Sequence, residues 1–173
     1  MKTIVMIPTY NESENIVKLI QSIKQLKIPN LHILVADDNS PDKTWQLVEN
    51  LRKKDKTIHI LRRMKNKGRG LAGIAGFKEA LNLGADAIIE MDADYSHHPK
   101  YIPSLLTGLK QADMTLGSRF VKGGNDGDRP LWRQFVTFGA NMYIRLFLGI
   151  KVKDCNSGYR CYKRKVLEKI NLN

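Results

Sequence analysis

The chain of 173 residues is long enough for one domain with a sizeable core, and its 42% hydrophobic and 27% charged residues are typical of a globular protein. No run approaches the roughly 20 apolar residues that a membrane-spanning helix needs, and two cysteines are too few for a disulfide scaffold. The sequence therefore predicts one domain in a reducing compartment, without a transmembrane segment. The first predicted strand begins too early to leave room for a signal peptide.

The net charge of +12 is unevenly distributed along the chain. Residues 43–78 hold eleven basic and two acidic side chains, residues 119–173 hold twelve and four, and residues 79–118 hold two and six. An acidic centre between basic flanks suits a phosphate-rich substrate or an anionic membrane surface. Nucleic acid is the competing partner of a basic protein. It is disfavoured because no helix-turn-helix, zinc-ligand or RNP signature accompanies the charge.

Apolar, β-branched runs alternate with helical patterns along the chain. This alternation predicts an α/β fold with a mostly parallel sheet flanked by helices. The expected strands are Thr3–Ile7, Leu31–Ala36, Ile58–Leu61, Ala87–Met91 and Met114–Gly117. The expected helices are about Ser13–Leu26, Ser40–Arg52, Leu71–Leu83, one after Pro99 and one from about Lys163. Because ligands of such sheets bind at the carboxyl ends of the strands, we expect the site to be formed by the residues that follow each strand.

The segments after the first two strands carry side chains that suit a nucleotide. Pro8-Thr9-Tyr10-Asn11-Glu12 offers an aromatic ring for stacking on a base and a carboxylate for hydrogen bonding. Asp37-Asp38-Asn39-Ser40 offers a carboxylate that can accept from a base N–H or a ribose hydroxyl. In isolation each segment is more often a helix cap or a turn.

Gly68-Arg69-Gly70-Leu71-Ala72-Gly73 matches the G-x-G-x-x-G pattern of dinucleotide-binding proteins. That motif belongs on the first strand–helix turn, directly after a strand, whereas here the basic segment Arg62–Lys67 separates strand from glycines. We therefore set the dinucleotide interpretation aside. A helix N-terminus approached by Lys67 and Arg69 can still receive a pyrophosphate.

Asp92 and Asp94 follow the fourth strand and give the strongest functional signal. Two residues apart on an extended backbone, their side chains point the same way. Such like charges repel unless a cation lies between them, and hard oxygen ligands with room for water and phosphate suit Mg²⁺ or Mn²⁺. A solvated acidic loop is the alternative. His97 and His98 lack a second ligand cluster, which favours a loop-ordering role over zinc binding.

Arg119 follows the fifth strand, and Arg133 lies beyond a polar, glycine-rich segment at 122–129. Two arginines there suit bidentate binding of a second phosphate. The next segment, Pro130–Ile150, mixes aromatic and aliphatic residues with arginines. Its sequence leaves two interpretations open: a helix packed into the core, or an interfacial helix lying on a bilayer.

In this order the motifs resemble those of the family-2 glycosyltransferases with a GT-A fold, and among these the dolichyl- or polyprenyl-phosphate mannose synthases. The resemblance covers essentially the whole chain and rests on Ile7–Glu12, Asp37–Asp42, Met91–Asp94, Ser96–Pro99, Gly117–Arg119 and Ser157–Arg160. It implies a single GT-A domain over residues 1–173 that lacks the family's C-terminal part. Residues 119–150 would form an acceptor loop and an amphipathic, membrane-facing segment.

The resemblance also implies roles for single residues. The nucleotide would be held by Pro8, Tyr10, Glu12, Asp38 and Asp92; the metal by Asp92 and Asp94, assisted by Ser96; and the catalytic residues would be Asp94, Arg119 and Arg133. The two arginines would meet phosphates of donor and acceptor.

The implied reaction is an inverting transfer of mannose from GDP-mannose to a polyprenyl or dolichyl monophosphate, with Mg²⁺ or Mn²⁺. It would take place at the cytoplasmic face of a membrane, the endoplasmic reticulum in a eukaryote or the plasma membrane in a prokaryote. The alternatives are transfer of glucose or another sugar from UDP or GDP to the same lipid, and an inactive nucleotide-binding fragment or subunit. Attachment to the membrane would come from the segment 119–150, a small membrane-anchoring subunit or further chain.

Overall fold

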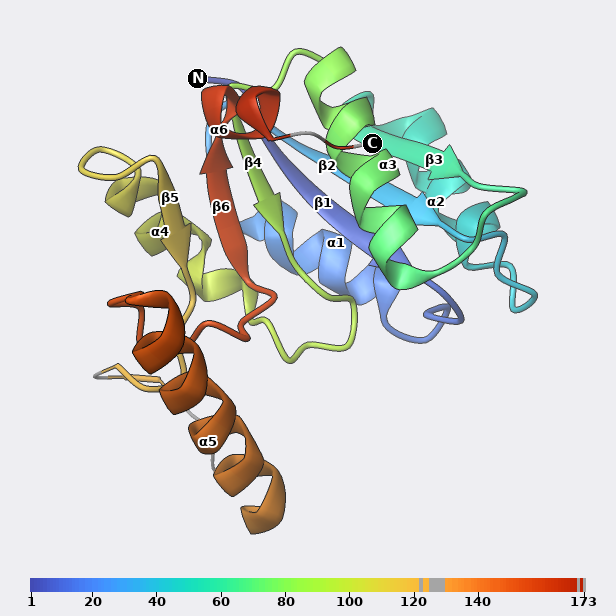
Figure 1. The fold of residues 1–173 in the computed structure, drawn as a ribbon. Helices are drawn as coiled ribbons and strands as arrows, with labels where there is room; N and C mark the ends of the chain where they lie inside the picture. The colour runs from blue at the N-terminus through green and yellow to red at the C-terminus, as the bar shows by residue number, and fades with distance from the viewer. Residues whose placement is uncertain (122, 125–129, 171, 173) are drawn as a thin grey trace.

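The computed structural model describes residues 1–121, 123–124, 130–170 and 172, and these form an α/β fold around one six-stranded sheet (Figure 1). The strands are β1 (Thr3–Thr9), β2 (Leu31–Asp37), β3 (Ile58–Arg62), β4 (Ala87–Glu90), β5 (Met114–Leu116) and β6 (Arg160–Lys163). Their order across the sheet is β3-β2-β1-β4-β6-β5. Among these described strands, β6 runs opposite to the other five and pairs antiparallel with β4 and β5, so the predicted mostly parallel sheet is confirmed.

Helices cover both faces of this sheet. They are α1 (Ile16–Gln25), α2 (Thr44–Lys54), α3 (Arg69–Asn82), the 3-10 turn η1 (Pro99–Tyr101), α4 (Ile102–Gly108), α5 (Leu131–Leu148) and α6 (Arg164–Lys169). One apolar layer joins the sheet to α1, α2 and α4, and a second joins it to α3 and α6 (Figure 1). The three layers agree with the predicted α/β architecture.

The central strand β1 supplies both layers because successive side chains point to opposite faces. Val5 and Ile7 pack against the α1 side, whereas Ile4 and Met6 pack against the α3 side. Helix α3 approaches this strand closely at Gly76, where a Cβ atom would lie 2.7 Å from the Met6 Sδ atom. The glycine therefore lets α3 pack on the middle of the sheet.

The start of α2 and the strand β6 differ from the prediction. Helix α2 begins at Thr44 rather than at Ser40, because carboxylates hydrogen-bond the backbone N–H groups between these positions. Asp37 accepts from the Ser40 N–H at 2.9 Å, and Asp42 accepts from the Thr44 N–H at 3.0 Å. These bonds form turns that compete with helix. Strand β6 was not predicted, because four residues of mixed polarity carry little local signal for pairing with β4 and β5.

Helix α5 projects away from the rest of the domain (Figure 1). Its two buried residues are polar, Thr137 and Asn141, whereas Phe135 is 74% exposed and Leu146 is 73% exposed. The interpretation of this segment as a core-packed helix is therefore wrong. No helix in the described part of the chain is long and apolar enough to cross a membrane. Of the predicted glycine-rich segment 122–129, all but 123–124 lies outside the described residues.

A pair of histidines joins the adjacent strands β2 and β3. His32 Nδ1 lies 3.0 Å from His59 Nε2, and the two rings stack with centroids 5.3 Å apart. One of these nitrogens must donate and the other accept, so the pair shares a single proton. Burial, as the largest cause, lowers the pKa of both side chains. The charge of Lys2 lowers the pKa of His32 further, and His32 does the same for His59.

This histidine pair predicts a loss of stability in mild acid. An unfolded chain protonates each imidazole near its ordinary pKa of 6.5, whereas the folded pair protonates only at lower pH. The pair therefore leaves the free energy of unfolding unchanged above that pH and reduces it as the pH falls below it. We expect urea unfolding from about pH 7.5 down to about pH 5 to show a steeper loss in the wild type than in the double variant His32→Gln/His59→Gln. Equal pH slopes in the two proteins would contradict the prediction.

Candidate functional site

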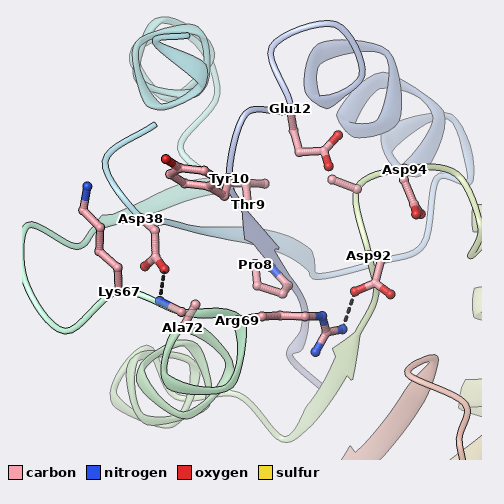
Figure 2. Close-up of a pocket in the computed structure, with 12 residues that line it drawn as sticks. Pro8, Thr9, Tyr10, Glu12, Asp38, Lys67, Arg69, Ala72, Asp92 and Asp94 are labelled. Atoms are coloured by element: carbon pink, nitrogen blue, oxygen red, sulfur yellow. Dashed lines mark hydrogen bonds and ion pairs between the residues drawn. The ribbon is translucent and has the colours of Figure 1, made fainter. Parts of the chain in front are cut away.

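A cavity of about 650 Å³ opens where β1, β2 and β4 end, beside the N-terminus of α3 (Figure 2). It is lined by Pro8, Thr9, Tyr10, Glu12, Asp38, Lys67, Gly68, Arg69, Ala72, Asp92, Ala93 and Asp94. Three strands thus bring their following segments to one edge, as expected for a parallel sheet. All predicted nucleotide-binding residues and both acidic predicted metal ligands line this cavity, whereas Ser96, Arg119 and Arg133 do not.

The two carboxylates after β4 are held by different partners. Asp92 Oδ1 accepts a hydrogen bond from the Arg69 guanidinium (Figure 2). Asp94 Oδ1 accepts from the backbone N–H of Ser96 at 3.0 Å. Burial by itself raises the pKa of Asp94, but the hydrogen bonds from Ser96 outweigh it and lower this pKa below its ordinary value. The carboxyl group of Asp94 is therefore ionised at neutral pH.

His97 orders the loop after β4 as a neutral side chain. Its Nδ1 atom accepts from the Asp92 backbone N–H at 2.9 Å, so this nitrogen carries no proton. Burial lowers the pKa of His97 despite the neighbouring carboxylates, and its ring stacks on Tyr159 with centroids 4.9 Å apart. His98 Nδ1 accepts from the Lys100 N–H at 3.1 Å and caps η1. The predicted loop-ordering role of both histidines is confirmed.

Arg69, the first residue of α3, reaches two acidic side chains. Besides Asp92, its Nη1 atom lies 3.5 Å from Glu90 Oε1. Burial raises the pKa of Glu90 although Arg69 opposes the shift. Gly158 packs close to this arginine: a Cβ atom there would lie 3.4 Å from Arg69 Nη2 and 3.2 Å from His97 Cε1, so a side chain would need small shifts of its neighbours. The sequence indicated Arg69 as a pyrophosphate contact at a helix N-terminus but not its pairing with Asp92 and Glu90, and it indicated Gly158 only through the segment Ser157–Arg160.

Asp38 has two partners that the sequence did not indicate. One carboxylate oxygen accepts from the Arg63 guanidinium, and the other accepts from the backbone N–H of Gly68 at 2.6 Å. The Arg63 side chain is 9% exposed and that of Asp38 is 5% exposed. Arg63 also donates to the carbonyl oxygen of Asn66. Asp38 therefore fixes the segment that leads into α3, in addition to lining the cavity beside Tyr10.

The two arginines predicted to bind phosphates lie elsewhere. Arg119 donates from Nε and Nη2 to the fully buried Asp154, at 2.9 and 2.8 Å. Burial by itself raises the pKa of Asp154, but the bonds from Arg119 lower it below its ordinary value. Arg133 lies at the start of α5, with its guanidinium 5.2 Å from the centroid of the Trp132 ring. Phosphate binding by both arginines stays a prediction.

Asp92 and Asp94 suit a metal ion that shares its ligands with a bound diphosphate. In the described part of the chain, no three His, Cys, Asp or Glu side chains are grouped so as to hold an ion by themselves. Mg²⁺ and Mn²⁺ commonly take one or two carboxylates and complete their coordination with phosphate oxygens and water. The open cavity beside the two carboxylates leaves room for such ligands.

The family model described as Glycosyl transferase family 2 matches residues 4–171 of this chain. The chain belongs to this family. It is 42% identical over 173 residues to the polyprenol monophosphomannose synthase of Mycolicibacterium smegmatis, covering 99% of this chain and 65% of that protein. It is 41% identical over 177 residues to the dolichol-phosphate mannosyltransferase of Pyrococcus furiosus, covering 100% of this chain and 49% of that protein. The chain thus spans about half to two thirds of the length of these relatives.

Solved structures with a similar fold are glycosyltransferases of the GT-A class. A mannosyltransferase from Pyrobaculum calidifontis in complex with GDP-Man and Mn²⁺ matches with a TM-score of 0.63 and 16% identity, over 97% of this chain and 46% of that one. Glucosyl-3-phosphoglycerate synthase from Mycobacterium tuberculosis matches with a TM-score of 0.67 and 19% identity, over 95% and 56%. The predicted GT-A fold of this chain is therefore confirmed.

The buried ion pair of Asp38 predicts a large loss of stability in Asp38→Ala. The substitution leaves the Arg63 guanidinium buried without its counter-charge, which typically costs about 3–5 kcal/mol. Glu168→Ala is a suitable control, because it breaks the exposed ion pair with Arg164 and should cost about 0.5 kcal/mol. Urea unfolding of the two variants measures the difference. A cost for Asp38→Ala as small as that of the control would show that the pair does not stabilise the fold.

Proposed function

We propose that this protein transfers mannose, with inversion, from GDP-mannose to a polyprenyl monophosphate. The observation that carries this proposal is the cavity with Asp92 and Asp94 in a chain that is 42% identical to a polyprenol monophosphomannose synthase. Two further relatives, 37% and 41% identical, have names that specify mannose transfer to undecaprenyl phosphate and dolichol phosphate.

The donor nucleotide is assigned to the end of the cavity formed by β1 and β2. Tyr10 is 56% exposed there and offers its ring for stacking on the base, near Asp38 (Figure 2). Pro8 and Glu12 belong to the same lining. The diphosphate would then extend past the N-terminus of α3, whose backbone N–H groups and partial positive charge favour anions.

The metal site is assigned to Asp92 and Asp94, with Ser96 fixing Asp94 through its backbone N–H. Mg²⁺ or Mn²⁺ bound there would neutralise the charge that develops on the departing diphosphate. Support for a divalent cation comes from two carboxylates that line one cavity and supply the hard oxygen ligands that Mg²⁺ and Mn²⁺ prefer.

The acceptor needs no general base, because a phosphate monoester is already anionic at neutral pH. The remaining task of the protein is to hold the acceptor in line with the sugar, since orientation alone lowers the barrier substantially. We assign this task to Arg133 and Arg119, each of which has a planar guanidinium suited to phosphate. Asp154 holds the guanidinium of Arg119 in a fixed orientation.

A membrane surface is the partner that we assign to α5. Its polar residues Thr137 and Asn141 face the protein, and its large apolar residues face outward, the reverse of an ordinary surface helix. Arg133 near its start and Arg145 in its last turn would meet anionic headgroups. This arrangement would bring the cavity to a lipid acceptor at the cytoplasmic face of a membrane.

Transfer of radiolabelled mannose tests the proposed reaction. With GDP-mannose, undecaprenyl phosphate and Mn²⁺, the full-length protein should form an organic-extractable product. Asp94→Ala should lower this activity by roughly a hundredfold and remove the Mn²⁺ dependence of GDP binding, because a metal ligand is lost. The control Asp113→Ala removes an exposed carboxylate before β5, at the opposite end of the sheet, and should leave both unchanged.

Two outcomes of this assay would redirect the proposal. Tighter calorimetric binding of UDP than of GDP would indicate a UDP-sugar donor. A wild-type protein that binds GDP and Mn²⁺ without forming product would indicate a nucleotide-binding subunit. Arg133→Ala should keep GDP binding and lose transfer, because an acceptor contact acts only when the lipid is present.

Membrane binding by α5 predicts that Phe135→Glu reduces co-sedimentation with phosphatidylglycerol-containing liposomes at least about tenfold. Burial of such an aromatic side chain is worth about 1.5–3 kcal/mol. Because Phe135 is exposed, the variant should keep its circular dichroism spectrum. Met64→Glu is the matched control, since Met64 is 61% exposed but lies outside α5. Equal binding of the two folded variants would exclude the bilayer as the partner of α5.

A further inference from the structure

The carboxylate of Asp92, one of the two that would hold a metal ion, has a cationic partner in the structure. The Arg69 guanidinium donates to Asp92 Oδ1 (Figure 2). Its Nη1 atom also lies 3.5 Å from Glu90 Oε1. His97 supplies no charge there, because its Nδ1 atom accepts the Asp92 N–H. Arg69 therefore neutralises Asp92 in the protein without metal.

We propose that Arg69 is a positioning residue with two alternative partners: Asp92 in the metal-free protein, and the donor diphosphate once a divalent cation binds at Asp92. The inference deepens the proposed function and rests on it for the presence of metal and nucleoside diphosphate. No group transfer is involved. The change is an exchange of ion-pair partners by one side chain.

The geometry makes Arg69 suited to this exchange. Its backbone is fixed as the first residue of α3, after Gly68 is held by Asp38 at 2.6 Å. Its side chain is 55% exposed, so it can change rotamer without opening the core. Both partners lie within one cavity, because Arg69 lines it together with Asp92 and the residues assigned to the nucleotide.

The electrostatics give the exchange its direction. A divalent cation held by Asp92 would compete with Arg69 for the carboxylate oxygens and would repel the guanidinium. The diphosphate that shares the metal offers new oxygens, and a guanidinium binds such groups through two parallel N–H bonds. Arg69 therefore opposes metal binding when nucleotide is absent and supports nucleotide binding when metal is present.

The exchange couples the two ligands. By linkage, a nucleotide that draws Arg69 away from Asp92 tightens metal binding, and the metal tightens nucleotide binding by the same factor. Lys67 provides a comparison within the same cavity. It carries the same charge, but it extends away from Asp92 at the Asp38 end (Figure 2).

Mn²⁺ binding to the full-length protein, followed by the electron paramagnetic resonance signal of free Mn²⁺, tests the proposal without any turnover. In the absence of nucleotide, Arg69→Met should bind Mn²⁺ roughly three- to tenfold more tightly than the wild type, a range expected for one partly exposed charge-assisted pair. Saturating GDP should tighten Mn²⁺ binding less in Arg69→Met than in the wild type. The matched control Lys67→Met should change nucleotide-free Mn²⁺ affinity less than about twofold, since it removes a charge without vacating Asp92.

Two results would overturn the proposal: unchanged or weaker Mn²⁺ binding in Arg69→Met, or an equal gain in Lys67→Met, which would indicate a general charge effect. Arg69→Gln is the second variant if the methionine variant does not fold, and the same outcomes apply to it. A failure of the proposed function would give a different result from these two. If GDP does not bind the wild type, the assigned donor is wrong, while the nucleotide-free Mn²⁺ measurement still decides the role of Arg69.

Discussion

Asp92 and Asp94 follow β4 and line one cavity, and the folded protein holds their two carboxylates with different partners. The Asp94 carboxylate accepts a hydrogen bond from the uncharged backbone N–H of Ser96. The Asp92 carboxylate instead accepts from the positively charged guanidinium of Arg69. His97, which lies close to both, stays neutral because its Nδ1 atom is occupied by a backbone N–H. Asp94 therefore stays ionised in the folded state, whereas the charge of Asp92 is offset by Arg69.

The position of Arg69 depends in turn on a second acidic residue in a neighbouring strand. Asp38, just after β2, binds Gly68 directly and Arg63 as a buried ion pair, and these contacts set the start of α3. The end of the cavity assigned to the base and the end assigned to the metal are thus joined through one short segment. A substitution at Asp38 will act on both ends, so its effect on nucleotide affinity cannot be attributed to one lost hydrogen bond.

Helix α5 exposes large apolar side chains, and their contact with water is energetically unfavourable. The buried positions of this helix are polar, whereas ten of its large apolar residues are exposed. These ten are Leu131, Trp132, Phe135, Val136, Phe138, Met142, Tyr143, Leu146, Phe147 and Leu148. Contiguous apolar surface of this kind marks an interaction site rather than a solvent-facing one. The helix joins the domain through specific polar contacts, among them the Asn141 side chain, which accepts from the Cys155 N–H at 2.8 Å.

The sequence by itself determined the α/β class, most of the strands and the residues that gather at the cavity. These follow from local periodicity and from the rule that parallel strands end at one edge, so Tyr10, Asp38 and Asp92 could be placed together without coordinates. Only the tertiary structure decided which charges meet. Arg69 and Asp92 are 23 residues apart, and Arg63 and Asp38 are 25 apart, so nothing in the neighbouring sequence encodes either pair.

The same limit applies to β6 and to α5. The pairing of β6 between β4 and β5 joins segments that are distant in the chain, and its short mixed sequence has no period of its own. Apolar residues occur on several sides of α5, so periodicity could not tell a core helix from an exposed one. The contact of Thr137 and Asn141 with the domain decided it, because a helix buries the face that its neighbours in space, rather than in sequence, are able to cover.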